Sequence, residues 1–196
     1  MSFNVLIIPE DFVVDQYMVK PIVEAMLDEL NVKKHRVRVC MDPRFRGVSQ
    51  AMDWERLEPV VDRYAAMTDL FLLLVDRDGT RGRRAALTGI ERLAGEQLGD
   101  TAMFLAENAW QELEVWVLAG MADLPKQWNW QAIRAECDPK EVYYAPYAKK
   151  RGLSEAPYAG REQLAKEAAR SFDRVRQLCP QDVASLQSRL QDALGE

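Results

Sequence analysis

The feature that most constrains this sequence is a run of six apolar residues, Leu70 to Val75, which ends in the acidic turn Asp-Arg-Asp-Gly. An apolar run this short, closed by a turn signal, is typical of a strand buried on both faces of a parallel sheet. Two acids, Asp76 and Asp78, follow the run with one residue between them. Acids just past a strand are often only turn formers, but such a pair can also hold a metal ion.

Three more strands are predicted around this run, over residues 3–8, 35–40 and 101–107. Helices are predicted over residues 14–30, 54–67, 81–97 and 108–120, the last with Asn108 as its N-cap and Gly120 at its end. In 14–30 the apolar residues recur every four positions, as in an amphipathic helix. The alternation of predicted strands and helices along the chain predicts an α/β fold with a mainly parallel central sheet of about four strands and helices on both faces.

The composition and the periodicity of the sequence change after Gly120. Residues 121–160 are rich in proline, tryptophan and tyrosine with weak periodicity, which predicts an irregular segment with a short helix near 127–135. Helices are predicted over 161–179 and 180–194, the second with Pro180 at its start. We therefore expect two parts: an α/β domain over residues 1–122, and residues 123–196 as an irregular segment and C-terminal helices packed on it.

Residue counts exclude several chemistries. The 196-residue chain has one histidine, His35, so a Ser-His-Asp or Cys-His mechanism would have to use it. His35 lies among four basic residues, where a solvated junction between a helix and a strand is the better interpretation. The cysteines Cys40, Cys137 and Cys179 lack zinc-site spacing, and their odd number makes a disulfide framework improbable. An enzyme with this composition would have to work with its acids or lysines.

The charge and the hydropathy of the chain limit where it acts. No apolar run approaches the roughly 20 residues that span a bilayer, and the N-terminus does not resemble a signal peptide. We expect a cytoplasmic protein without a membrane partner. The net charge of −5 argues against bulk electrostatic binding to nucleic acid. Local basic runs occur at residues 33–38, 81–84 and 149–151, and such runs are most often solvated surface.

Acids stand at the ends of three predicted strands. Glu10 follows the first, Asp76 and Asp78 follow the third, and Glu107 ends the fourth. Ligands of open parallel sheets bind at the carboxyl ends of the strands. Several acids gathered there repel one another unless a cation or a proton intervenes. We expect Glu107 itself to be an acid at a helix start, favoured by the helix dipole.

A glutamate after the first strand and an Asp-x-Asp after a later one form the signature of Toprim-type metal sites. The chain resembles, over nearly its full length, a family of bacterial Toprim-like domains of unknown function. The resemblance rests on an ordered set of motifs: Glu10 before a helix, Asp76-Arg77-Asp78, Glu114-Val115-Trp116, Pro139-Lys140, the basic stretch 147–152 and Cys179-Pro180.

The resemblance implies a function. Toprim domains in topoisomerases, primases and nucleases act on nucleic-acid phosphodiesters with magnesium, and relatives of this family are often encoded beside an ABC-type ATPase in phage-defence pairs. It implies a Mg²⁺- or Mn²⁺-dependent nuclease effector that works with such an ATPase. The implied site residues are Glu10, Asp76 and Asp78 as catalytic residues and metal ligands, Glu114 as a further ligand, and Lys140, Lys149 and Lys150 as substrate-binding residues.

Other interpretations stay open at this stage. The family usually has glycine after the first glutamate where this chain has Asp11, so Glu10 could be displaced or joined by Asp11. A non-catalytic Toprim-like module that binds and regulates an ATPase is therefore the alternative function. Response-regulator-like or sugar-phosphate α/β domains also bind magnesium at strand ends, although the Glu-x-Trp and Pro-Lys motifs count against them. Glu112 and Glu114 point to different faces of a helix, so at most one reaches the acidic edge.

Overall fold

The computed structural model describes residues 2–195 of the chain. At its centre lies a four-stranded sheet, in which the strands pair in the order β2-β1-β3-β4 and all three pairings are parallel. The strands are β1 (Phe3–Pro9), β2 (His35–Val39), β3 (Leu70–Asp76) and β4 (Met103–Ala109). The predicted α/β fold with a parallel sheet of about four strands is confirmed, and it is consistent with a Toprim-like fold.

Strand β3 is buried on both faces, as its apolar run predicts. Leu70, Leu72 and Leu74 belong to one hydrophobic cluster, and the alternate residues Phe71, Leu73 and Val75 belong to a second cluster on the opposite face. This alternation follows from the two-residue period of side chains along a strand. The sheet thus separates two cores, each of which needs a layer of helices to cover it.

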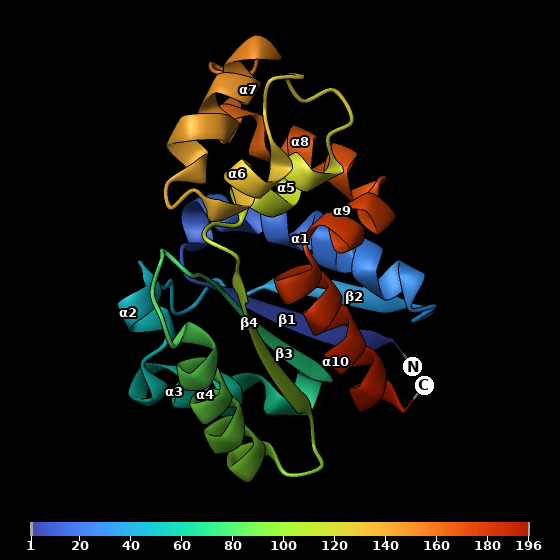
Figure 1. Ribbon diagram of the computed structural model, residues 1–196. Coiled ribbons are helices and arrows are strands. Elements are labelled where there is room, and N and C mark those ends of the chain that lie inside the picture. The colour runs from blue at the N-terminus through green and yellow to red at the C-terminus, as the bar shows by residue number, and fades with distance from the viewer. Residues whose placement is uncertain (1, 196) are drawn as a thin grey trace.

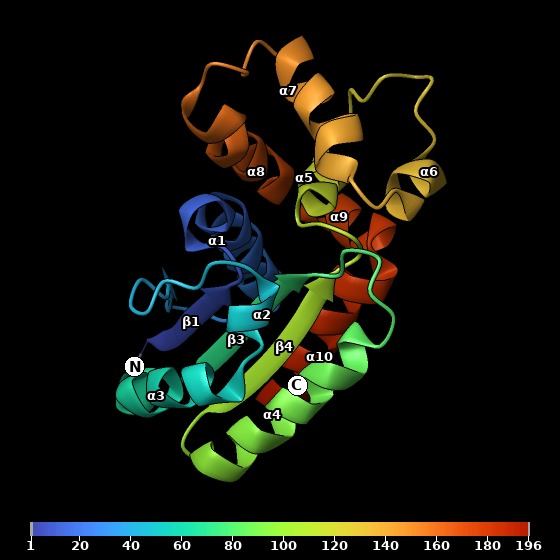
Figure 2. The ribbon, with the colours of Figure 1, turned by 90° about the vertical axis from the view of Figure 1, so that its left-hand side faces the viewer.

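Helices cover both faces of the sheet (Figures 1 and 2). The helices α2 (Val48–Ala51), α3 (Trp54–Tyr64) and α4 (Arg83–Leu98) cover one face, and a 3₁₀ turn at Ala65–Met67 follows α3. The helix α1 (Phe12–Glu29) lies on the other face with α5 (Glu114–Gly120) and the C-terminal helices. Within residues 2–195, no helix is both long and apolar enough to cross a membrane.

Strand β4 runs further than the sequence predicts. It pairs with β3 as far as Ala109, which lies opposite Asp76, so Asn108 belongs to the strand and does not cap a helix. Helix α5 begins only at Glu114. Glu107 lies inside the strand with 1% of its surface exposed, and Arg189 holds its carboxylate at 3.1 Å. The prediction of a helix-start acid at Glu107 is therefore wrong, because Glu107 lies within β4. Arginine side chains compensate its charge there.

The C-terminal third is more regular than its sequence predicts. The short helix predicted near 127–135 is α6 (Trp130–Ala135), but Lys140–Tyr144 form an unpredicted π-helical turn that continues into α7 (Ala145–Lys150). A 3₁₀ turn at Pro157–Gly160 follows. The predicted helix 161–179 is two helices, α8 (Arg161–Ala169) and α9 (Phe172–Leu178). The last helix is a π-helical turn at Pro180–Ala184 followed by α10 (Ser185–Leu194).

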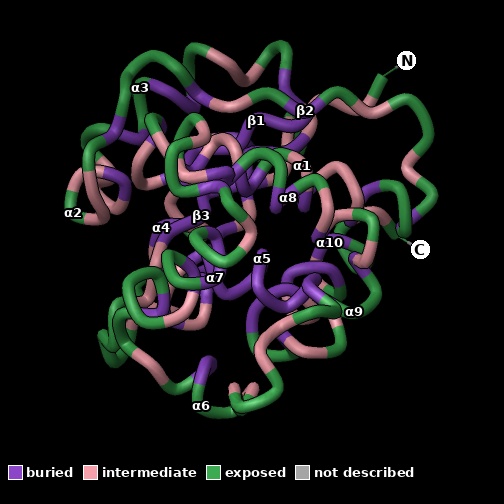
Figure 3. The backbone as a smooth tube through the Cα atoms, turned by 90° about the horizontal axis from the view of Figure 1, so that it is seen from above, coloured by how far each residue is buried: buried purple, intermediate pink, exposed green. Residues whose placement is uncertain are grey.

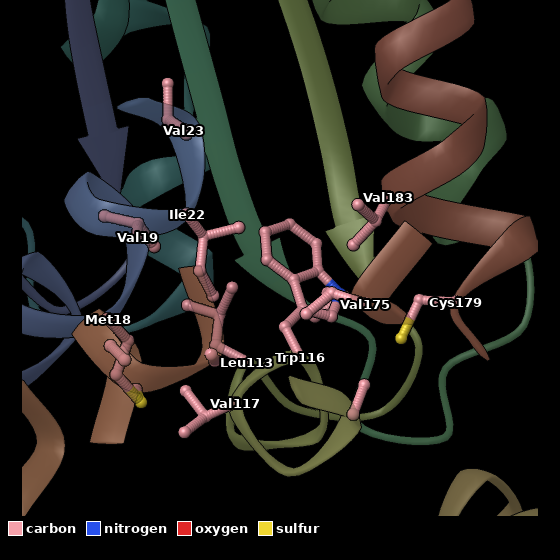
Figure 4. Close-up of a cluster of buried hydrophobic side chains, with 14 of the residues drawn as sticks. Met18, Val19, Ile22, Val23, Leu113, Trp116, Val117, Val175, Cys179 and Val183 are labelled. Carbon is pink, nitrogen blue, oxygen red and sulfur yellow. The ribbon is translucent and has the colours of Figure 1, made fainter. Parts of the chain in front are cut away.

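The C-terminal helices share one core with the α/β part. The buried segments of the chain meet in the middle of the molecule, whereas its outer loops are exposed (Figure 3). Trp116 of α5 is fully buried, with Ile22 of α1 on one side and Val175 and Val183 of the C-terminal helices on the other (Figure 4). Side chains from before and after residue 122 therefore pack in a single hydrophobic cluster.

Candidate metal centre

The carboxyl ends of β1 and β3 lie side by side, and a hydrogen bond joins them. Oε2 of Glu10 accepts the backbone N–H of Asp76 at 3.0 Å. This contact places two acids that are far apart in the sequence at one edge of the sheet. The edge is the one where ligands bind in open parallel sheets.

The acidic turn after β3 is held by the loop that follows β4. The backbone oxygen of Gln111 accepts the N–H groups of Arg77 at 2.8 Å and of Asp78 at 3.2 Å. The side chain of Gln111 accepts the N–H of Gly79 at 2.9 Å. Gln111 is itself buried, and it has a positive φ of 78°. Gln111 thus accepts three hydrogen bonds that fix the turn, and no motif in the sequence marks Gln111 for this role.

Three carboxylates converge at this turn. Asp76, Asp78 and Glu112 each offer an oxygen atom, and these atoms all lie within 4.8 Å of one another. Asp76 also accepts the N–H of Leu113 at 2.9 Å, and Glu112 accepts the N–H of Lys140 at 2.8 Å. The sequence predicted Asp76 and Asp78, but it favoured Glu114 over Glu112 as the further ligand.

Glu114 has a different partner. Its carboxylate forms a salt bridge of 2.7 Å with Arg161 of α8, and both side chains are buried. Glu114 is therefore not a solvated acid on the helix surface. The salt bridge with Arg161 ties α5 to α8. Glu112, and not Glu114, offers an oxygen atom to the group formed with Asp76 and Asp78.

The acid after Glu10 does not distort the turn. Asp11 has φ −124° and ψ 103°, an extended conformation that needs no glycine. Its carboxylate caps α1 by accepting the N–H of Val13, and its own N–H donates to Asp15 at 2.9 Å. Asp11 is thus an N-cap residue, and Glu10 accepts the backbone N–H of Asp76.

Five acids of this edge have raised pKa values. Burial raises the pKa of Asp76 well above its ordinary value, and the charges of Glu10 and Glu114 raise it further. Burial is also the largest cause at the other four acids. It raises the pKa values of Glu10 and Asp78, and those of Glu112 and Asp15 to about 7 and about 8.

These acids form no salt bridge within the described residues, although the charge of Arg83 lowers the pKa values of Glu10 and Asp78 in part. No lysine or arginine in residues 2–195 lies within salt-bridge distance of Glu10, Asp15, Asp76, Asp78 or Glu112. Clustered carboxylates without a counter-charge need either protons or a cation. Hard divalent cations such as Mg²⁺ and Mn²⁺ prefer oxygen ligands of this kind. The residues present therefore fit such an ion.

Asp182 stabilises the loop that carries Gln111 and Glu112, and the sequence did not indicate this role. It is fully buried, and its Oδ2 accepts the backbone N–H of Trp110 at 2.8 Å and the Nε1–H of Trp116 at 2.7 Å. Arg134 donates to both of its oxygens, at 3.0 and 3.1 Å. Asp182 therefore fixes the start of the loop that carries Gln111 and Glu112. Only its position just after the Cys-Pro motif could have drawn attention to it.

The three candidate lysines do not gather at the site. The backbone N–H of Lys140 contacts Glu112, but its ammonium group lies 3.8 Å from Glu141. Lys149 and Lys150 occupy the last turn of α7. Nζ of Lys150 donates to the backbone oxygen of Asp123 at 3.5 Å. Lys140 lies near enough to Glu112 to lower its pKa, and a substrate-binding role of the three lysines stays a prediction.

Fold and site together define an α/β protein with a parallel sheet and an uncompensated carboxylate cluster at the carboxyl edge of the strands. The chain matches no known family model, no curated protein and no solved structure. Membership of the Toprim-like family therefore stays a prediction from the motifs.

Proposed function

We propose that this protein is a Mg²⁺- or Mn²⁺-dependent, phosphodiester-cleaving effector of the Toprim type that acts on nucleic acid. The observation that carries the proposal is the convergence of Asp76, Asp78 and Glu112 beside Glu10, with no basic partner in the described residues. Such a cluster would suit a hard divalent cation, which takes oxygen ligands.

Each acid has a distinct task in this proposal. Asp76, Asp78 and Glu112 would hold the ion, which when bound polarises a phosphoryl oxygen. Glu10 fixes the backbone of Asp76 through one carboxylate oxygen. Burial raises the pKa of Glu10 above its ordinary value, and its carboxylate lies beside the cluster, so we assign Glu10 as the general base or acid.

The proposed partner is an ABC-type ATPase, and the proposed setting is cytoplasmic antiviral defence. Both come from the motif resemblance. The chain contains no G-x-x-x-x-G-K-[ST] loop, so any ATP dependence would come from another protein. Its net charge of −5 also fits a basic partner that would supply part of the electrostatic attraction for nucleic acid.

One observation favours a second function, a non-catalytic module that regulates its ATPase partner. Arg161 neutralises Glu114, which the resemblance implies as a metal ligand. The two functions differ in whether the carboxylate cluster is needed for cleavage.

The test is a cleavage assay with labelled DNA and RNA in Mg²⁺ or Mn²⁺, using the protein alone and in the complex that co-purifies with it. Asp76→Asn keeps the shape of the side chain and should abolish cleavage while leaving assembly intact. Asp100→Asn, in an exposed turn, is the matched control and should cleave normally. If Asp76→Asn cleaves the labelled nucleic acid as well as the wild type does, the effector role is rejected and the regulatory function is left.

A further inference from the structure

A hollow in the protein surface lies beside the carboxylate cluster, on the side of α4. It has a volume of about 220 Å³ and opens between the acidic turn, the start of α4 and the end of β4. Three of its nine lining residues are arginines, namely Arg77, Arg83 and Arg84. A concave surface with this charge is suited to an anion.

Arg77 presents a fixed and unpaired guanidinium group. Its Cζ lies 3.9 Å from the centre of the Trp110 ring, so the planar group stacks on the indole. Arg77 has no carboxylate partner among residues 2–195. Stacking holds the guanidinium in place and leaves its N–H groups for an acceptor in the plane of the group.

Arg83 supplies a second unpaired charge. Its Nη2 donates only to neutral oxygens, the backbone oxygen of Arg77 at 3.4 Å and Oγ1 of Thr80 at 3.3 Å. Its Nε is buried with no hydrogen-bond partner. Arg83 also lies close enough to Glu10 and Asp78 to lower the pKa values of both. It therefore stands between the hollow and the carboxylate cluster.

The one acid that lines the hollow is already compensated. Glu107 lies 3.7 Å from Arg84 and 3.1 Å from Arg189. The remaining positive charge of the hollow thus belongs to Arg77 and Arg83. The N-cap residue of α4 is Gly82, which provides no side-chain cap, so the free N–H groups of the first turn of α4 add to the positive potential.

We propose that Arg77 and Arg83 form a subsite for a phosphoryl group, which in the proposed function is a backbone phosphate of the nucleic acid cleaved at the adjacent carboxylates. Guanidinium groups bind phosphate oxygens in pairs with charge-assisted hydrogen bonds. The carboxylate cluster would hold the cation, and the two arginines would hold the substrate. The proposal rests on the proposed function for the source of the phosphate but not for anion binding.

The test is titration of the full chain with inorganic phosphate at low ionic strength, with EDTA present to remove divalent cations. Arg77→Gln and Arg83→Gln should each weaken binding about tenfold or more, the loss expected for a hydrogen bond to a charged group. Arg92→Gln is the control, because Arg92 is an exposed residue of the same helix that pairs with Glu96. Circular dichroism and thermal melting show whether each variant is folded.

A short single-stranded oligonucleotide distinguishes backbone phosphate from the free anion. The oligonucleotide should displace inorganic phosphate from the wild type, and the Arg77→Gln chain should bind it more weakly than the control chain does. Wild-type phosphate affinity in both arginine variants would overturn the subsite. Failure of the oligonucleotide to compete would overturn its assignment to substrate.

The failure of this subsite and the failure of the proposed function are separable with Mn²⁺. Arg77→Gln keeps the backbone N–H that bonds to Gln111, so it should bind Mn²⁺ like the wild type. Asp76→Asn should lose Mn²⁺ and still bind phosphate in EDTA. Arginine-dependent phosphate binding without any Mn²⁺ binding would reject the metal centre and leave the subsite standing.

Discussion

Oε2 of Glu10 accepts the backbone N–H of Asp76 across 66 positions of sequence, at 3.0 Å. This bond joins the first and third strands at the edge where the acids gather. It places the proposed proton-transfer residue beside a residue proposed to bind the ion.

The metal-free protein should lose stability as pH rises from about 4 to about 8. The pKa of Asp15 is raised from 3.8 to about 8 and that of Glu112 to about 7. The folded state therefore binds more protons than the unfolded state in this window, and its stability is greatest below it. Urea unfolding in EDTA at a series of pH values measures the effect. Stability that increases with pH across this window would contradict it.

The same experiment with Mn²⁺ should show a pH-dependent rescue. A cation binds the ionised carboxylates, so it should stabilise the protein more at pH 8 than at pH 5. Asp76→Asn removes one buried carboxylate, and its amide oxygen can still accept the N–H of Leu113. The variant should be more stable than the wild type in EDTA at pH 8, and Mn²⁺ should stabilise it less.

Glu112→Gln and Glu114→Gln should separate metal binding from structure. Glu112→Gln removes a carboxylate of the cluster and should weaken Mn²⁺ binding about tenfold, with little change in stability at pH 5, where Glu112 of the wild type is protonated. Glu114→Gln leaves Arg161 as a buried charge without a carboxylate and should destabilise the fold by about 3 kcal/mol. Calorimetric titration and urea unfolding measure the two effects. The reverse pattern would return the ligand role to Glu114.

Gly120 allows a close approach between α5 and α8. A Cβ at this position would lie 2.4 Å from the Cα of Ala168, so Gly120→Ala should destabilise the protein by about 3 kcal/mol. Gly89 of α4 has open space around the same position, and Gly89→Ala should stabilise the protein by about 0.5–1 kcal/mol. Equal effects of the two substitutions in urea unfolding would show that α5 can shift away from α8.

The sequence predicts the sheet well because its signals are local. The apolar run before Asp76 and the four-residue period in 14–30 depend only on neighbouring residues. The tertiary partners are different. Glu107 stays in a strand because arginines from α4 and α10 compensate it, and Glu114 is buried because Arg161 lies 2.7 Å away. No spacing rule reveals these pairs.

The candidate site was predicted in part for the same reason. Asp76, Asp78 and Glu10 stand at strand ends, and the topology of a parallel sheet brings strand ends together. Glu112 and Gln111 lie in a loop whose path depends on the late start of α5. Helix periodicity assigned them to a helix face and could not show which acid reaches the cluster.

The central claim is that the carboxylates at the sheet edge bind a divalent cation, and Mn²⁺ titration followed by electron paramagnetic resonance tests it most directly. The wild type and Asp100→Asn should bind one Mn²⁺ at pH 8. Asp76→Asn, Asp78→Asn and Glu112→Gln should each bind it at least about tenfold more weakly, the loss of one charged contact. Equal Mn²⁺ affinity in all five proteins, or no binding by the wild type, would contradict the account.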